Sequence, residues 1–279
     1  MKYQDHAGPM LFRDRGDWMV AGLLLGLLSV LAGLVFWGLP RAGRLAVRWI
    51  PPEWERRLGD SALSSVVAGK AEKSGIRVAM AQAIVERLIG EDATWSYRVT
   101  IAAEDPQVNA MALPGGAMVV TQGMLQRCES PEELAGVLAH EIVHVRRRHG
   151  VQRMGQQAGL NLLLLLLTGG DPGGLWSGAA GLTALHHDRA AEEEADREGF
   201  ALMVRAQLDP SGMVRVFRTM QAVERESGQP RLPDFLSDHP DVEARLAWME
   251  AEMKRQSGPW RPLALPRPWL NMKFPSPAQ

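Results

Sequence analysis

The chain is almost without cysteine: Cys128 is the single one among 279 residues. A lone thiol excludes an intrachain disulfide and a cysteine-based metal cluster, so any metal site must use His, Asp and Glu. It leaves the cellular compartment open, because one thiol is compatible with either side of a membrane.

The sequence also lacks an excess of either charge, with 31 basic and 32 acidic side chains and a net charge of −1. This balance provides no overall field that would attract a polyanion, so a nucleic-acid partner is not indicated. Hydrophobic residues at 46% and charged residues at 23% are ordinary for a folded globular protein. The length suits one sizeable domain with appendages.

Charged residues are absent from Trp18–Leu39, a run of about 22 positions that is long enough for a helix to span a ~30 Å hydrocarbon layer. Trp18 and Trp37 lie near its ends, where indole rings favour the membrane interface. A buried core helix is one alternative. A signal peptide is another, but the run is too long and no small-x-small cleavage pattern follows it. We therefore expect a single-pass transmembrane anchor after an N-terminal flank, residues 1–17.

The side of the membrane depends on the Lys and Arg residues that flank this span. Two arginines precede it, and more follow it at Arg41, Arg44 and Arg48. The positive-inside rule favours, by a small margin, a cytoplasmic C-terminal domain.

Residues 40–59 are expected to form a linker and residues 60–257 an α+β domain. Helical patterns cover Ser61–Lys73 and Val78–Ile89. Alternating, β-branched segments separated by turn residues then predict a small antiparallel sheet. Its strands are expected at Tyr97–Ala102, Val108–Leu113 and Ala117–Thr121.

The next helix has clear start and stop signals. Ser130 to Glu133 form a capping box, in which Ser130 caps the helix and Glu133 can reach back to the Ser130 amide. Gly150 is the expected terminator, and the basic residues before it, His149 among them, suit the C-terminal end of the helix dipole. Later helices are expected at about Leu185–Ala206, after Asp209-Pro210 and from Pro240 to about Gln256, followed by a Pro-containing tail, residues 258–279.

The sequence His140-Glu141-Ile142-Val143-His144 lies on the first of these helices. Residues four apart share a helix face, so the two imidazoles can converge on one cation, and Glu141 can reach a water molecule beside it. Two histidines on a solvated face would be the alternative, but the flanking residues are largely apolar. Burying this set without a cation would be unfavourable, which favours a metal site.

A catalytic zinc ion needs a third protein ligand, and the acidic segment Ala190–Phe200 is the richest source. Glu192 and Asp196 share a helix face, so Glu192 can coordinate while Asp196 accepts a hydrogen bond from a histidine. Spacing alone does not separate Glu192 from its acidic neighbours. Gly199, without a side chain, would let this helix approach the first one closely.

The two segments Glu133–His144 and Arg189–Gly199 together resemble the HtpX/BepA-like membrane-associated zinc metallopeptidases, gluzincins related to the CAAX prenyl endopeptidase. The resemblance covers roughly Thr94–Met249. It implies a mostly helical, zincin-like domain with one Zn2+ ion held by His140, His144 and Glu192 and supported by Asp196. It also implies a bacterial inner-membrane location and unfolded, membrane or envelope protein substrates, as in protein quality control.

Two further segments resemble parts of this family. Asn109, Ala110, Met111, Ala112 and Leu113 match the strand beside the active-site cleft, which would pair with an extended substrate. Leu236 to Pro240, with Arg245, resembles the later His-Pro motif. Within it, His239 either forms the turn before a helix or swings onto the open position of the zinc and holds the enzyme latent.

The chain departs from the family just before Glu192. A tyrosine often precedes the serine and arginine at this place, whereas this sequence has His187-Asp188-Arg189. The donor that assists the reacting carbonyl is therefore left open between His187 and Arg189, and a polar helix start is the alternative for His187.

These observations predict a zinc metalloendopeptidase with Glu141 as general base. One alternative is a non-catalytic, membrane-anchored chaperone or adaptor that retains the fold, although the metal and base residues are intact. A metal enzyme of another reaction type is a second alternative. The apolar stretch Gly159–Leu185 has arms too short to span a membrane, which favours a core hairpin or a contact with the membrane surface.

Overall fold

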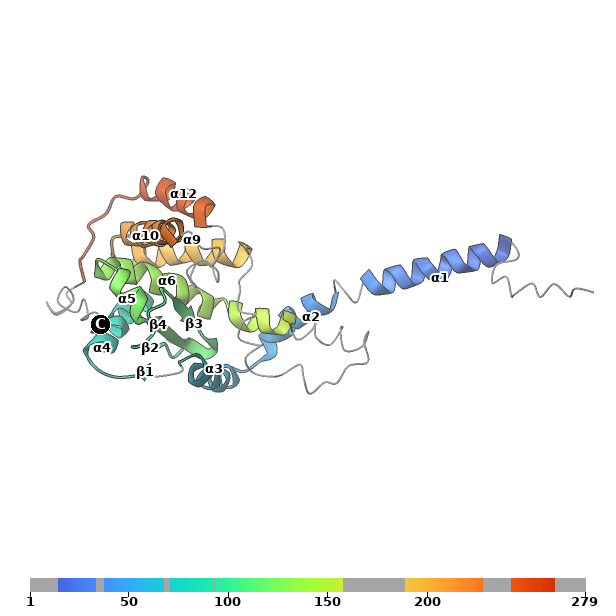
Figure 1. Ribbon diagram of the computed structural model, residues 1–279, viewed down its shortest axis with the longest axis horizontal. Helices are drawn as coiled ribbons and strands as arrows, with labels where there is room; N and C mark the ends of the chain where they lie inside the picture. The colour runs from blue at the N-terminus through green and yellow to red at the C-terminus, as the bar shows by residue number, and fades with distance from the viewer. Residues whose placement is uncertain are drawn as a thin grey trace, which may run out of the picture.

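The computed structural model describes residues 15–33, 38–67, 71–92, 94–157, 189–227 and 242–263, and it has helices stacked on a small sheet (Figure 1). The four strands are β1 (Ala71–Glu72), β2 (Arg98–Ala102), β3 (Ala110–Ala112) and β4 (Ala117–Thr121), in the order β1-β2-β4-β3.

The prediction of a purely antiparallel sheet was wrong, because β2 and β4 run parallel. β3 and β4 form a hairpin, but β3 does not pair with β2, the strand before it in the chain. Instead β4 lies between them and takes the same direction as β2. β3 is consequently an edge strand.

The β3–β4 hairpin turns through a short 3-10 segment, Pro114–Gly116, that lies against α3 (Pro52–Val66). Gly115 has φ 71°, a left-handed conformation, and a Cβ atom there would collide with the backbone of Arg56. Both observations require glycine at this position. The turn and α3 therefore hold each other in place.

The two faces of the sheet are covered by different helices, because alternate side chains of a strand point to opposite faces. Met118 and Val120 of β4 belong to the main core, with α4 (Ile76–Ile89) and α6 (Pro131–Arg146). Ala117 and Val119 pack in a smaller cluster with apolar side chains of α3. The sheet thus separates α3 from the helices that carry the candidate site.

α6 is the central helix, with every residue from Glu133 to Val145 buried. It packs against α9 (Arg189–Arg205) and α10 (Ser211–Ser227), and α12 (Val242–Met253) covers these two (Figure 1). Two glycines permit the close packing. A Cβ atom on Gly136 would lie 2.6 Å from the Met213 Cα atom, and one on Gly199 would lie 3.1 Å from the backbone nitrogen of His140.

Both ends of α6 differ slightly from the prediction. Ser130 caps the helix, since its Oγ accepts the Glu133 amide at 3.3 Å, but the Glu133 carboxylate accepts the amide of Glu129 instead of that of Ser130. The helix ends at Arg146, and Arg148 adopts a left-handed φ of 58°. Helical conformation then resumes over 149–157, so the prediction of Gly150 as terminator was wrong.

The predicted span Trp18–Leu39 is not supported as one transmembrane helix. α1 (Arg15–Gly33) and α2 (Leu39–Ala46) cover parts of it, and residues 34–37 lie outside the described residues. Among the described helices, none has the length and apolar character needed to cross a membrane.

Residues 40–59, expected to be a linker, are mostly helical and packed. They contain most of α2, a 3-10 turn at Val47–Trp49 and the start of α3, and Val47 is buried. α2 approaches residues 149–157 so closely that a Cβ atom on Gly43 would collide with Gly155. The stretch 159–185, His187 and His239 lie outside the described residues.

The contact at Gly136 provides a test of this packing. Gly136→Ala should lower the free energy of unfolding by about 1–3 kcal/mol, because the added methyl group meets the α10 backbone. Denaturant-induced unfolding of the purified protein measures this effect. Gly22→Ala is the control, since nothing lies within 4 Å of its added Cβ atom. A Gly136→Ala protein that gains the ~0.5–1 kcal/mol that alanine adds inside a helix would contradict the packing.

Candidate metal centre

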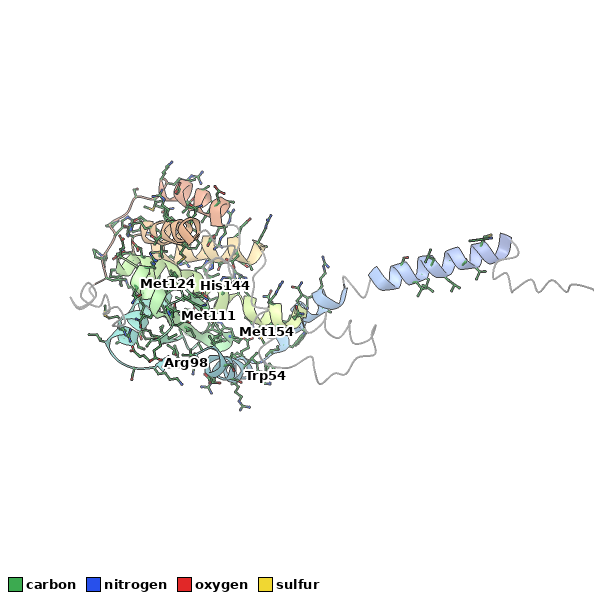
Figure 2. All side chains as sticks on the ribbon, viewed as in Figure 1. Trp54, Arg98, Met111, Met124, His144 and Met154 are labelled. Carbon is green, nitrogen blue, oxygen red and sulfur yellow. The ribbon has the colours of Figure 1, made fainter. Side chains whose placement is uncertain are left out.

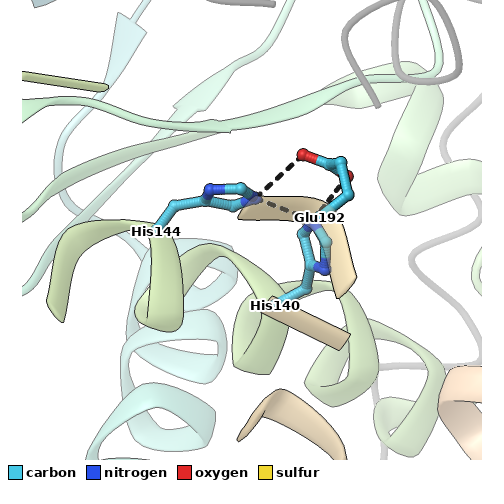
Figure 3. A group of neighbouring side chains, drawn as sticks. All are labelled: His140, His144 and Glu192. Carbon is cyan, nitrogen blue, oxygen red and sulfur yellow. Dashed lines mark hydrogen bonds and ion pairs between the residues drawn. The ribbon is translucent and has the colours of Figure 1, made fainter. Parts of the chain in front are cut away.

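Three buried side chains from two helices converge at the centre of the domain (Figure 3). His140 and His144 lie one turn apart on α6, and their Nε2 atoms are 2.9 Å from each other. Glu192 reaches them from α9, with its carboxylate oxygens 3.5 Å from His140 Nε2 and 3.4 Å from His144 Nε2. The structure thus brings together the three metal ligands expected from the sequence.

The donor set fits a metal ion. Two imidazole nitrogens and one carboxylate oxygen are ligands typical of catalytic zinc sites. The other nitrogen of each ring is engaged elsewhere: His140 Nδ1 lies 3.0 Å from Asp196 Oδ1, and His144 Nδ1 lies 2.9 Å from His149 Nδ1. Both Nε2 atoms are therefore directed toward the carboxylate of Glu192 and a common point.

Arg245 of α12 holds the two carboxylates in place. Its Nε and a terminal nitrogen bind Asp196 at 2.5 and 2.8 Å, and its other terminal nitrogen lies 2.8 Å from Glu192 Oε2. Burial alone would raise the pKa of Asp196, but the hydrogen bonds from Arg245 and His140 outweigh it and lower that pKa. Asp196 is consequently ionised and can accept the Nδ1 proton of His140.

The acidic surroundings also act on His140 when no metal is bound. Burial would lower the pKa of His140, but the hydrogen bonds to Asp196 and Glu192 raise it to about 9. The metal-free site therefore carries a proton on His140 at neutral pH, and this proton must leave before Nε2 can bind a cation.

The expected general base, Glu141, lies directly after the first ligand and is 1% exposed. The edge strand β3 lies nearby: Ala112, Leu113 and Pro114 line a small pocket together with His144. Figure 2 shows Met111 of β3 below His144. Asn109 and Ala110 are buried, whereas Met111 and Ala112 are partly exposed.

Of the three remaining candidates, only Arg189 belongs to the described residues. Arg189 is exposed at the start of α9, and His187 and His239 lie outside the described residues. Their roles at the reacting carbonyl or as a latency switch stay predictions.

Two residues at the site had no assigned role from the sequence. Arg245 was noted only as part of a motif, because it is 49 residues from its partner Asp196. His149 was placed at the end of the helix dipole, yet it is buried against His144. The signal available for His149 was its position five residues after a ligand, just beyond the end of α6.

An H-E-x-x-H helix, a third ligand from a later helix and a buried glutamate between the two histidines define a metallopeptidase site. The profile described as Peptidase family M48 matches residues 76–253, and the chain belongs to this family.

Individual relatives agree with this assignment. The chain is 32% identical over 187 residues to a fission-yeast protein named mitochondrial metalloendopeptidase OMA1, covering 62% of this chain and 54% of the relative. It is 32% identical over 154 residues to the beta-barrel assembly-enhancing protease of Yersinia pestis, covering 50% of this chain and 31% of the relative. The human metalloendopeptidase OMA1 is 28% identical over 194 residues, covering 61% and 36%. The chain thus spans about half the length of these relatives or less.

The raised pKa of His140 predicts that zinc binding displaces a proton. At pH 7.5 the metal-free protein should release about one proton more per zinc ion than it does above pH 9, because His140 is already neutral there. Calorimetric titration in buffers of different ionisation enthalpy measures the number of protons. Asp196→Asn should reduce the release at pH 7.5, because it removes a group that raises the pKa of His140. Binding enthalpies that do not depend on the buffer would contradict this picture.

Proposed function

We propose that this chain is a zinc-dependent metalloendopeptidase that hydrolyses peptide bonds in proteins. The observation that carries the proposal is the convergence of His140, His144 and Glu192, with the buried Glu141 directly after His140 in the chain. Glu141 is not one of the possible metal ligands. A non-catalytic adaptor that kept only the fold and the metal would therefore have no need of it.

A bound zinc ion would lower the pKa of a water molecule toward ~7 and polarise the carbonyl oxygen of the substrate. Glu141 accepts the proton of the attacking water and then delivers it to the leaving amine. His140, His144 and Glu192 would hold the ion, and Asp196 and Arg245 keep His140 and Glu192 oriented. Low exposure of these groups keeps the reaction away from bulk water.

The edge strand β3 is suited to binding a protein substrate in an extended conformation. Its outer edge is not paired within the described sheet, and its end lies beside His144 in the small pocket. A substrate backbone that adds to this edge would run past the metal centre, with main-chain hydrogen bonds providing affinity for many sequences. Such binding requires an unfolded segment, which suits a role in the quality control of membrane or envelope proteins.

We further propose that α1 associates with a lipid bilayer, as in a protein bound at the bacterial inner membrane. α1 extends away from the domain, and its apolar side chains are exposed (Figure 2). Leu23 is 72% exposed and Leu27 65% exposed, values that are unfavourable in water. The Lys and Arg residues around the span favour a cytoplasmic domain by a small margin.

The catalytic proposal is tested by Glu141→Gln. This variant should keep its zinc but lose at least about a hundredfold of the cleavage rate, because the amide cannot accept the proton of water. An unfolded β-barrel membrane protein serves as substrate, and zinc content is measured on the same samples. Chelation should abolish wild-type cleavage, and zinc should restore it. A Glu141→Gln protein that cleaves at the wild-type rate would remove Glu141 from the mechanism.

The membrane proposal is tested by flotation of the purified full chain with liposomes. Wild-type protein should float, and the double variant Leu23→Glu/Leu27→Glu should stay at the bottom of the gradient, because charged side chains resist burial in lipid. Both proteins should bind zinc equally, which controls for folding of the domain. Equal flotation of the two proteins would show that α1 is not the lipid-binding element.

A further inference from the structure

His149 is a buried titratable side chain that the proposed reaction does not use. It follows the end of α6, where Arg148 adopts its left-handed φ of 58°. Arg148 is held in this conformation by Glu55 of α3, which accepts from its Nε at 2.5 Å, and by the Ile50 carbonyl at 2.7 Å. This break turns the chain so that the His149 ring lies against His144, with only 6% of the residue exposed.

His149 connects a metal ligand to α9. Its Nδ1 lies 2.9 Å from His144 Nδ1, and its Nε2 lies 3.1 Å from Glu194 Oε2. The two rings meet nearly edge to face, at an interplanar angle of 71°. Glu194 is in turn fixed by Arg147, whose Nε lies 3.1 Å from its other oxygen.

The positions of the protons follow from these distances. Two Nδ1 atoms at 2.9 Å share one proton, so one ring donates and the other accepts. Glu194, when ionised, only accepts, so it favours the proton of His149 on Nε2. His149 Nδ1 then carries a lone pair and accepts from His144 Nδ1. As a result His144 carries its proton on Nδ1 and presents the lone pair of Nε2 toward His140 and Glu192.

The opposite assignment would block the site. If His149 donated from Nδ1, neutral His144 would carry its proton on Nε2, directed at the other ligands. That tautomer cannot bind a cation through Nε2. The orientation of the His149 ring and its contact with the Glu194 carboxylate therefore determine whether His144 can bind a cation through Nε2.

We propose that His149 and Glu194 are positioning residues that hold His144 in its metal-binding tautomer, an inference that rests on the proposed zinc site. The arrangement is a relay of carboxylate, imidazole and ligand imidazole. It parallels the direct contact between Asp196 and His140, so both histidine ligands are oriented by acidic residues of α9. The two arms differ in exposure, because the side chain of Asp196 is buried and that of Glu194 is 40% exposed.

The experiment compares two amide substitutions of His149 in the full chain. In His149→Asn the amide oxygen can take the place of Nδ1 and still accept from His144. In His149→Gln the amide group falls near the position of Nε2, so it can reach Glu194 but leaves His144 without its acceptor. His149→Leu removes both contacts. Asn should therefore bind zinc nearly as tightly as wild type, whereas Gln and Leu should lose about ten- to a hundredfold in affinity.

Zinc affinity is measured by competition with a chromophoric chelator, and thermal unfolding of the metal-free proteins shows which variants fold. Long-range 1H–15N spectra of the folded, metal-free proteins, recorded above pH 9 where His140 is neutral, report whether His144 carries its proton on Nδ1 or Nε2. The wild-type and Asn proteins should show the Nδ1–H form, and the Gln and Leu proteins should show a mixture of the two.

Two variants of α9 provide a matched pair. Glu194→Gln removes the charge that anchors His149 and should lower zinc affinity by a smaller factor, about threefold to tenfold, because this carboxylate is partly exposed to solvent. Glu198→Gln removes another acidic partner of Arg147 that has no described contact with His149. It should leave zinc affinity unchanged. This pair also tests the relay if the His149 variants fail to fold.

The relay would be overturned if folded His149→Leu bound zinc as tightly as wild type, or if Asn and Gln lost affinity equally. It would also be overturned if Glu194→Gln behaved like Glu198→Gln. Wild-type protein that bound no zinc would instead refute the proposed function, so the two failures are distinguishable.

Discussion

The metal centre depends on a balance of charge in a dry interior. Among the described residues of this centre, three carboxylates, those of Glu141, Glu192 and Asp196, are buried with one guanidinium, that of Arg245. Ionised, they leave an excess of two negative charges, which equals the charge of one divalent cation. Because unpaired buried charges are strongly unfavourable, the metal-free site recovers part of the balance by protonating His140. The elevated pKa of this histidine and the affinity of the site for a cation thus have the same electrostatic cause.

The interactions among these buried charges also determine how the helices are arranged. Asp196 and Glu192 come from α9, their ligand partners from α6, and Arg245 from α12, so the ion pairs join all three helices. The close approach of α9 to α6 is permitted by Gly199, which lies beside the backbone of His140 itself. Any displacement of α9 would therefore move the third ligand and the support of the first ligand together. The packing and the metal site are one structural unit.

The local parts of this unit could be predicted from the sequence, and the long-range parts could not. The H-E-x-x-H spacing, the Ser130 cap and the acidic helix of Glu192 are patterns within single helices, and their elements were found close to the expected positions. The parallel pairing of β2 with β4 was missed, since strand order is not encoded in alternation. The role of Arg245 was missed because its partners are about 50 residues away. The left-handed Arg148 was missed because non-glycine residues rarely adopt this conformation.

Arg148 shows how elements remote from the metal contribute to its geometry. A left-handed conformation is unfavourable by roughly 1 kcal/mol or more for a residue with a side chain, and uninterrupted helix would be the lower-energy path for the backbone. The buried Glu55 stabilises the break through its ion pair with Arg148, and Glu55 belongs to α3, on the far side of the sheet. If α6 continued as a regular helix through residue 148, the side chain of residue 149 would point in another direction and would not reach His144. The N-terminal helices therefore support the orientation of a metal ligand that belongs to another helix, and the left-handed conformation of Arg148 is the structural sign of this connection.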